Sequence, residues 1–388
     1  MEFRNKDKNH VLLQFLSRIL CNTSYIQPFS LNIYQSAKDC KLLFTLCGFP
    51  SPFYCLLPTA YCLLLYIYST MQITNASQLT GVFPALFTPL KNDDPKNLRT
   101  SIDYKKMGQM IDDVIANGAS GVLPAVTTGQ SATVSPQQHL DIIKFTLDYV
   151  DGRVPVIAGA GSNCTRESIE MIENVQKIAP VAVLCVTGYY NNPPQEGLLK
   201  HYRTLSSETG AKIVIYNVPG RTSSYVHPDT LIELAEDKNI IGLKQAVEFG
   251  FGEKFHEDTM RVIKETKGKD FAVMSGEDGL FADLLEMGGT GLISASGNIP
   301  EATKTFVDLY KAFQAGDKDK AHNLQKDARD FIDVTFCRKN PIPLGTLFNS
   351  PLFQPLVSVK DTANGADAVA RIMKLIEEKA PSLKKYHV

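Results

Sequence analysis

The chain has 388 residues, of which 44% are hydrophobic and 21% are charged, a composition typical of a globular protein with one large or two small domains. Lysine and arginine total 40 and aspartate and glutamate total 41, so the formal net charge is −1. This balance lacks the basic excess that binds nucleic acid. The seven histidines show no metal-ligand spacing, so we expect no metal site.

Residues 1–70 differ in composition from the rest of the chain and hold five of the eight cysteines. The apolar stretch 42–68 is long enough to cross a bilayer, which takes about 20 residues, but three prolines interrupt it. It also begins too late for the apolar region of a signal peptide. We therefore favour a poorly structured extension, with the first domain opening at Met71, over a membrane anchor or a targeting peptide.

The remaining cysteines, Cys164, Cys185 and Cys337, are widely dispersed. In a reducing compartment, cysteines that are spread in this way usually behave as small buried hydrophobic side chains. We therefore expect a cytoplasmic protein without a disulfide framework.

From Gly81 onward, short runs rich in Val, Ile, Leu and Ala alternate with amphipathic segments of helical spacing. Such unbroken apolar runs are typical of parallel strands buried on both faces. Eight of them occur, at residues 81–88, 121–126, 154–159, 181–187, 212–217, 240–244, 271–276 and 290–296. They predict an α/β fold, a (β/α)8 TIM barrel over 76–315, followed by a C-terminal helical region over 316–388.

A doubly wound open sheet is the structural alternative. It would place a glycine-rich dinucleotide turn after the first strand, where this chain has Thr88-Pro89-Leu90 instead. The sequence "GAGSN" at 159–163 lacks the third glycine and follows the third strand, so it is better explained as a tight turn.

Two helix starts carry residues that can cap them. Ser135 precedes Pro136, which predicts Ser135 as the N-cap and Pro136 at the first helical position. The segment "TRESIEMIENVQKI" begins with Thr165 and acidic residues, which predicts the same scheme with Thr165 as the cap.

Functional residues of such a barrel lie at the carboxyl ends of its strands. Lys244 is the most informative, because it ends an almost unbroken apolar run. A desolvated lysine favours the neutral amine, which forms Schiff bases with carbonyls; the alternative is an ordinary lysine that pairs with Glu248 or reaches solvent. Tyr216 ends the neighbouring strand and could move protons for Lys244, or it could be a core tyrosine with a satisfied hydroxyl.

Thr127 and Thr128 follow the second strand at a glycine turn. Their hydroxyls and backbone N–H groups could cradle a carboxylate, unless they only begin a helix. Arg221, after Pro219-Gly220, can hold a second carboxylate through two N–H groups, although alone it would be an ordinary loop arginine. Together these groups suit imine chemistry on a 2-oxo acid, and without a phosphate loop we expect no cofactor.

Six motifs carry a resemblance to a known family. They are "TTGQSATVS" (127–135), "GYYNNPPQEGL" (188–198), "YNVPGRTS" (216–223), "IIGLKQA" (240–246), "SGEDGLFADLLEMGGTGLISASGN" (275–298) and "NPIP" (340–343). In order and spacing they resemble the dihydrodipicolinate synthase / N-acetylneuraminate lyase family of class I aldolases, over about residues 76–380. The resemblance implies a lyase that condenses pyruvate with L-aspartate 4-semialdehyde to 4-hydroxy-tetrahydrodipicolinate, in diaminopimelate and lysine biosynthesis.

The resemblance also implies catalytic roles. Lys244 would form the Schiff base with pyruvate, and Tyr216 would be the general acid and base. Thr127 and Tyr190 would complete a proton relay to Tyr216, with the loop of Tyr190 meeting the active site of a neighbouring subunit. The protein would then be a homo-oligomer, either a dimer or a tetramer.

Substrate contacts follow from the same resemblance. Thr128 and Ile293 would contact pyruvate through their backbone, and Gly276 would line the pocket. Arg221 would bind the carboxylate of L-aspartate 4-semialdehyde.

Several positions depart from the family pattern. Gln130 and Gln245 stand where acidic residues are usual, Gly345 stands where a lysine is common, and Val126 replaces a glycine and would crowd its turn. The family's allosteric lysine site matches in part, at Ser131, Ala132, His139, Asn163, Glu167 and Tyr189, with Pro136 in place of a histidine.

Two other activities compete with the condensation. One is a sister pyruvate-dependent enzyme, N-acetylneuraminate lyase or a 2-keto-3-deoxy-sugar-acid aldolase. Arg221 discriminates against it, because lyase-like members usually lack this arginine. The other is a barrel that only binds or regulates, and the retained Lys244, Tyr216, Thr127 and Tyr190 argue against it.

Overall fold

The structure, a computed structural model, describes residues 72–387 apart from 95, 97, 98 and 248–251. The extension expected over residues 1–70 lies outside the described residues, and so does the choice between an extension, an anchor and a targeting peptide. The described residues belong to one compact unit, 67–388. Among their helices, none combines the length and the apolar character that a membrane crossing requires.

A parallel sheet forms the centre of the described part of the chain. Its seven strands are arranged in the order β1-β7-β6-β5-β4-β3-β2, and each neighbouring pair is parallel. They are β1 (Gly81–Pro84), β2 (Ala158–Gly159), β3 (Val183–Val186), β4 (Ile213–Asn217), β5 (Ile240–Gln245), β6 (Ala272–Ser275) and β7 (Gly291–Ser294). These strands coincide with seven of the eight predicted runs.

The eighth predicted run, 121–126, closes the sheet into a barrel. Val122 pairs in parallel with Val156, just before β2, and Leu123 pairs in parallel with Ala85, just after β1. Backbone hydrogen bonds of 2.8–3.1 Å accompany both pairings. The predicted (β/α)8 barrel is therefore confirmed, although this segment is paired too briefly to form a strand of its own.

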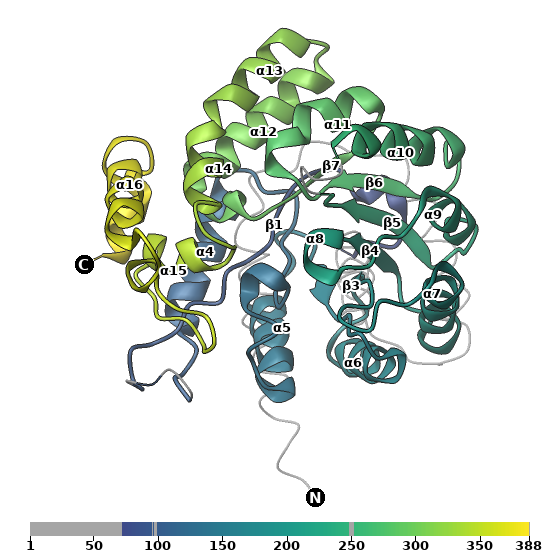
Figure 1. Cartoon of the computed structure of the whole chain (residues 1–388), viewed down its shortest axis with the longest axis horizontal. Helices are drawn as coiled ribbons and strands as arrows, with labels where there is room; N and C mark the ends of the chain where they lie inside the picture. Colours follow the sequence, from purple (N-terminus) through teal and green to yellow (C-terminus); the bar gives the residue numbers. More distant parts are fainter. Residues whose placement is uncertain (1–71, 95, 97–98, 248–251, 388) are drawn as a thin grey trace, which may run out of the picture. The chain divides into compact units, whose positions relative to one another are not determined.

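Helices surround the strands on the outside of the barrel (Figure 1). They are α4 (Tyr104–Ala116), α5 (Pro136–Val150), α6 (Thr165–Ile178), α7 (Gln195–Thr209), α9 (Pro228–Leu234), α10 (Gly252–Glu265), α11 (Phe281–Met287) and α12 (Pro300–Gln314). A single turn, α8 (Pro219–Thr222), lies between β4 and α9. Each of the eight helices follows one of the eight predicted apolar runs in the chain, as the predicted alternation requires.

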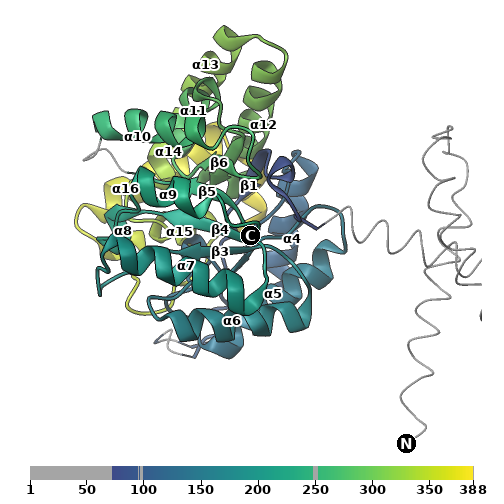
Figure 2. The same ribbon diagram turned by 90° about the vertical axis from the view of Figure 1, so that its right-hand side faces the viewer.

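Four further helices follow the barrel. They are α13 (Lys318–Asp327), α14 (Arg329–Thr335), α15 (Ile342–Leu347) and α16 (Gly365–Glu378). Helix α13 packs along α12, as Figure 2 shows, and α16 packs on α14 and α15. The C-terminal helices therefore extend the outer layer of the barrel and do not form a separate unit.

The two predicted helix caps have different outcomes. The Ser135 hydroxyl accepts from the N–H of Gln138 at 3.2 Å, and the Gln138 side chain accepts from the N–H of Ser135 at 2.9 Å, so this N-cap is confirmed. The prediction for Thr165 is wrong, because Cys164 is the N-cap of α6. The Thr165 hydroxyl lies instead 2.9 Å from Nδ1 of His201 on α7.

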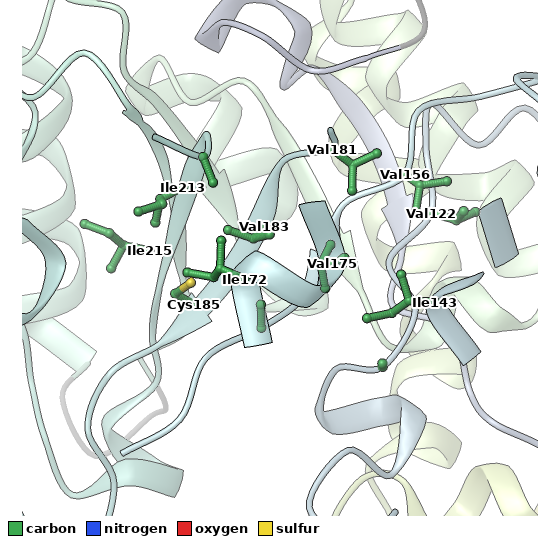
Figure 3. Packing of buried hydrophobic residues seen from close by; sticks show 14 of the residues in the cluster. Val122, Ile143, Val156, Ile172, Val175, Val181, Val183, Cys185, Ile213 and Ile215 are labelled. Atoms are coloured by element: carbon green, nitrogen blue, oxygen red, sulfur yellow. The ribbon is translucent and has the colours of Figure 1, made fainter. Parts of the chain in front are cut away.

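The barrel has an inner and an outer apolar core. Phe83, Leu184 and Ile293 belong to the inner core. Val183, the strand neighbour of Leu184, points the other way and packs in the outer core with Ile172 of α6 (Figure 3). Adjacent strand residues therefore lie in opposite cores, which explains why the strands are apolar at successive positions.

The three dispersed cysteines are free thiols. Cys185 is buried in the outer core, and burial raises the pKa of its thiol to about 12. Cys164 and Cys337 are only partly buried. The expectation of buried small hydrophobic residues therefore holds for Cys185 alone.

A buried amide joins the mouth of the barrel to the C-terminal region. The Gln130 side chain donates to the Thr88 carbonyl at 2.8 Å and accepts from the Phe353 N–H at 3.0 Å. A carboxylate could accept from Phe353 but could not donate to Thr88. The glutamine, where an acidic residue is usual, thus satisfies two backbone groups at once.

Replacing Gln130 with glutamate should destabilise the protein by about 1–3 kcal/mol, because it buries a charge and leaves the Thr88 carbonyl without its donor. Urea denaturation of wild type and Q130E measures the free energy of unfolding. The matched control is Q109E on the exposed face of α4, which we expect to change it by less than about 0.5 kcal/mol. Equal stability of Q130E and Q109E would contradict this account.

Candidate active site

A cavity of about 620 Å³ opens at the carboxyl ends of the strands. Thr127, Tyr216 and Arg221, three of the residues singled out from the sequence, lie on its wall. Asn340, from the segment between α14 and α15, lies there with them. The cavity therefore lies at the end of the barrel where functional residues are expected. Its wall combines residues from the middle and the end of the chain.

Lys244 is buried beside Tyr216 and is not itself part of the cavity wall. It lies opposite Tyr216 in the parallel register of β4 and β5, and its side-chain Nζ is 4.3 Å from the centroid of the Tyr216 ring. Only 6% of Lys244 is exposed, so it does not reach out to solvent. The other alternative partner, Glu248, lies outside the described residues.

Gly276 makes room for this lysine. Its N–H donates to the Gln245 carbonyl at 2.7 Å, which fixes the end of β6 against β5. A Cβ at position 276 would lie 3.0 Å from the Lys244 Cε and 2.6 Å from the Ala246 Cβ. A larger residue would therefore push the lysine out of its place beside Tyr216.

A neutral amide follows Lys244 at the end of β5. The Gln245 side chain accepts from the Asn217 amide at 2.9 Å and donates to the Thr259 hydroxyl at 3.2 Å. Gln245 is fully buried. The amide, where an acidic residue is usual, uses both its donor and its acceptor and adds no charge beside the lysine.

Thr127 and Thr128 belong to a short 3₁₀ turn, Thr127–Gly129. The backbone N–H groups of this turn make no hydrogen bond among the described residues, as expected for the first residues of a helical turn. Thr128 is buried, and its hydroxyl oxygen accepts from the Asn340 side-chain amide at 2.9 Å. The turn therefore offers backbone donors beside the cavity, in the arrangement that a carboxylate needs.

Val126, which was expected to crowd this turn, is accommodated. Its backbone is extended, with φ −104° and ψ −171°. A Cβ at Gly159 would lie 3.0 Å from the Val126 Cγ1 and 2.2 Å from the Ala125 carbonyl oxygen. The glycine on the neighbouring strand therefore provides the space that the valine takes.

Arg221 stands at the rim of the cavity on α8, which Pro219 begins. Its Nη2 donates to the backbone carbonyl of Asn340 at 3.0 Å, while the side chain stays exposed. A guanidinium carries five N–H donors, so the others are left to face the cavity. The segment Pro219–Thr222 is thus a helical turn that positions a cation.

Five of the predicted catalytic and substrate-binding residues are not on the cavity wall: Lys244, Thr128 and Gly276, which lie behind it as described above, and Ile293 and Tyr190. Ile293 is fully buried on β7 in the inner core. Tyr190 is 94% exposed, has a left-handed backbone with φ 73°, and is absent from the cavity wall. The described chain therefore does not bring Tyr190 together with Thr127 and Tyr216.

Five of the six residues matched to the allosteric lysine site line the same cavity, all except Asn163. Its wall includes Ser131, Ala132, Pro136, His139, Glu167 and Tyr189. The Asn163 side chain donates to the Tyr189 carbonyl at 3.1 Å and so holds the wall in place. Burial lowers the pKa of His139, whose Nε2 lies 2.7 Å from the Gly159 carbonyl.

Sequence reasoning assigned no role to two buried polar residues here. Asn340 stands in the motif "NPIP" (340–343) and Asp278 in the motif that spans 275–298, and neither motif by itself points to a role for them. Asp278 accepts from the Ser296 N–H at 2.8 Å, and burial raises the pKa of its carboxyl group. The one sign of these residues in the sequence is that each is a polar residue inside a motif. Their contacts are with residues far away in the sequence, so the motifs do not predict them.

Comparison with known proteins shows the family of this chain. The model of the dihydrodipicolinate synthetase family matches residues 78–351. The 4-hydroxy-tetrahydrodipicolinate synthase of Methanospirillum hungatei is 38% identical over 264 residues, which cover 68% of this chain and 86% of that protein.

Two solved structures have the same fold. The dihydrodipicolinate synthase of Acinetobacter baumannii, complexed with pyruvate, has a TM-score of 0.68 and 30% identity, over 76% of this chain and 98% of that one. The synthase of Cyanidioschyzon merolae, with lysine bound, has a TM-score of 0.69 and 30% identity, over 76% and 98%. With a closed barrel, a buried lysine facing a tyrosine and a family match over most of its length, the chain belongs to the dihydrodipicolinate synthetase family.

Proposed function

We propose that this enzyme condenses pyruvate with L-aspartate 4-semialdehyde through a Schiff base on Lys244 and forms 4-hydroxy-tetrahydrodipicolinate for the synthesis of diaminopimelate and lysine. The observation that carries the proposal is the buried Lys244 side chain, held 4.3 Å from the Tyr216 ring at the mouth of the barrel. A buried primary amine beside a phenol supplies both the nucleophile and the proton donor of imine chemistry.

The steps follow from these two groups. The unprotonated Lys244 amine attacks the C2 carbonyl of pyruvate, and loss of water from the carbinolamine leaves an imine. Removal of a methyl proton gives the enamine, which attacks the aldehyde carbon of the second substrate. The amino group of that substrate then closes the ring and displaces Lys244. Tyr216, on the cavity wall, donates and accepts the protons.

Pyruvate also brings a carboxylate that must be held. The N–H groups of the turn Thr127–Gly129 have no partner in the described chain, and the Thr128 hydroxyl lies beside them. Oriented backbone amides form a concave site for anions. We assign the carboxylate of pyruvate to this turn, with the backbone of Ile293 as a further pyruvate contact and Gly276 as a residue that lines the pocket.

The second carboxylate is assigned to Arg221. Its guanidinium stands at the cavity rim, anchored by one bond to Asn340, with further donors available for a bidentate contact. This arginine favours the synthase over the sister aldolases, whose sugar-acid substrates present hydroxyl groups where the semialdehyde presents its carboxylate.

Tyr190 is assigned to the site of a neighbouring subunit. A tyrosine that is 94% exposed in a left-handed backbone conformation is a costly arrangement for an isolated chain. In a homo-oligomer, a dimer or a tetramer, the ring would reach the partner's Thr127 and complete the relay to Tyr216. We place this assembly in the cytoplasm, where its two small-molecule substrates would be available.

L-Lysine is the proposed regulator at the far end of the cavity. Glu167 presents a carboxylate there, fixed by a hydrogen bond of 2.7 Å from the Ser162 hydroxyl. A carboxylate suits the ammonium groups of lysine, and the Tyr189 ring offers an aromatic face for its stem. The relative from Cyanidioschyzon merolae solved with lysine bound supports this assignment.

Purified enzyme given pyruvate should turn over with L-aspartate 4-semialdehyde and not with N-acetylmannosamine or a sugar aldehyde. Arg221→Ala should raise the KM for the semialdehyde about 10- to 100-fold, because a charged hydrogen bond to the carboxylate is lost, and should leave the KM for pyruvate nearly unchanged. Initial rates over both substrates measure these values.

The matched control is Arg203→Ala, which removes an exposed arginine paired with Glu233 on the outer helices. We expect it to leave both KM values at the wild-type level. Preferred turnover with a sugar aldehyde would establish the sister activity, and an Arg221→Ala effect confined to pyruvate would show that the role of Arg221 is misassigned.

Lysine should inhibit the enzyme, and Glu167→Gln should raise the half-inhibitory concentration about 10-fold or more, because the variant loses a charged acceptor. Without lysine, the variant should keep wild-type turnover. Glu173→Gln, an exposed change on the same helix away from the cavity wall, is the control. Unchanged inhibition of Glu167→Gln would contradict the assignment.

A further inference from the structure

Asn340 touches residues of both proposed substrate subsites. Its side-chain Nδ2 donates to the Thr128 hydroxyl oxygen at 2.9 Å across 212 positions of sequence. Its backbone carbonyl accepts from the Arg221 Nη2 at 3.0 Å across 119 positions. Asn340 therefore lies between the group assigned to the carboxylate of pyruvate and the group assigned to the carboxylate of the second substrate.

The bond from Asn340 dictates the direction in which the Thr128 hydroxyl donates. An oxygen that already accepts from an amide N–H must point its own hydrogen elsewhere. Thr128 is only 3% exposed, and its hydroxyl has no other hydrogen-bond partner among the described residues. The hydrogen is therefore left for a ligand at the turn Thr127–Gly129, where the free backbone N–H groups also lie.

The cost of holding Asn340 in place supports a role in function. The residue is 7% exposed, and its Oδ1 is buried without a hydrogen-bond partner in the described part of the chain. Leaving a buried acceptor unsatisfied is unfavourable, and such groups concentrate where a structure serves binding or catalysis. A merely structural asparagine would be expected to use both ends of its amide, as the buried Asn217 does.

We propose that Asn340 is a positioning residue for the condensation. Its side-chain amide holds Thr128 as a hydrogen-bond donor to the carboxylate of pyruvate, and its backbone carbonyl anchors Arg221 for the second substrate. The proposal rests on the proposed function and adds that the side chain and the backbone of this one residue serve different substrates. Only the pyruvate half depends on the side chain, because Arg221 is bound through the backbone.

Asn340→Asp tests the side-chain half with almost no change in shape. The carboxylate cannot donate to Thr128, accepts the Thr128 hydroxyl hydrogen instead, and places a negative charge beside the anion site. We expect the KM for pyruvate to rise about 10- to 100-fold and the KM for the semialdehyde to change by less than about 3-fold. Asn340→Ala, which removes the donor without adding charge, should raise the KM for pyruvate less than Asn340→Asp does.

A double-mutant cycle shows whether the effect passes through Thr128. In a Thr128→Val background the Asn340→Ala substitution should no longer raise the KM for pyruvate, because the hydroxyl that it orients is gone. Thermal unfolding and circular dichroism of each variant identify any that fail to fold. If Asn340→Asp does not fold, the cycle with Asn340→Ala alone decides the question.

The results separate this proposal from the function on which it rests. A wild-type enzyme that does not use pyruvate and the semialdehyde overturns the function. A wild-type enzyme that does, combined with an unchanged KM for pyruvate in Asn340→Asp, overturns the role of Asn340. Equal increases in both KM values, or independent effects of Asn340→Ala and Thr128→Val, would show that Asn340 only supports the loop and would also overturn it.

Discussion

The placement of Lys244 against Tyr216 is the constraint on which the rest of the structure depends. Burying a lysine is expensive unless its surroundings compensate. The parallel register of β4 and β5 sets the two residues side by side, and the ring faces the amine at 4.3 Å, within the range of a cation–π contact. Gly276 leaves the space that the lysine stem fills. Barrel closure through residues 121–126 encloses this arrangement and brings Thr127 to the same end.

Neutral amides organise the mouth of the barrel around this pair. Gln130, Gln245 and Asn340 each carry a donor and an acceptor on one planar group. Gln130 joins two backbone segments, and Gln245 joins Asn217 to Thr259. At the first two positions the family usually has acidic residues. In this chain, these two amides therefore join their neighbours through hydrogen bonds and add no charge of their own.

Most of the fold could be predicted from the sequence because its signals are local. Apolar runs mark strands buried on both faces, and Ser135 with Pro136 marks the start of α5. At the start of α6 the predicted N-cap is one residue too late. Thr165 has the side chain that usually caps a helix, but Cys164 occupies the N-cap position. The brief pairing of 121–126 was also hidden, because it depends on the geometry of barrel closure and not on composition.

The candidate site could be predicted only where a residue stands out from its own segment. Lys244 does so, because a lysine that ends an apolar run is conspicuous. Asn340 does not, because its importance lies in contacts with Thr128 and Arg221, far away in the sequence. The role of Tyr190 can be judged even less from one chain, since its ring is exposed and is absent from the cavity wall of the described chain.

Trapping of the imine tests the central role of Lys244 most directly. The enzyme is incubated with pyruvate, reduced with borohydride and digested, and the modified peptide is identified by mass spectrometry. The account predicts one reduced pyruvyl group per chain, on Lys244, and none when Lys244 is replaced by alanine. An adduct on another lysine, or full turnover without any adduct, would contradict it.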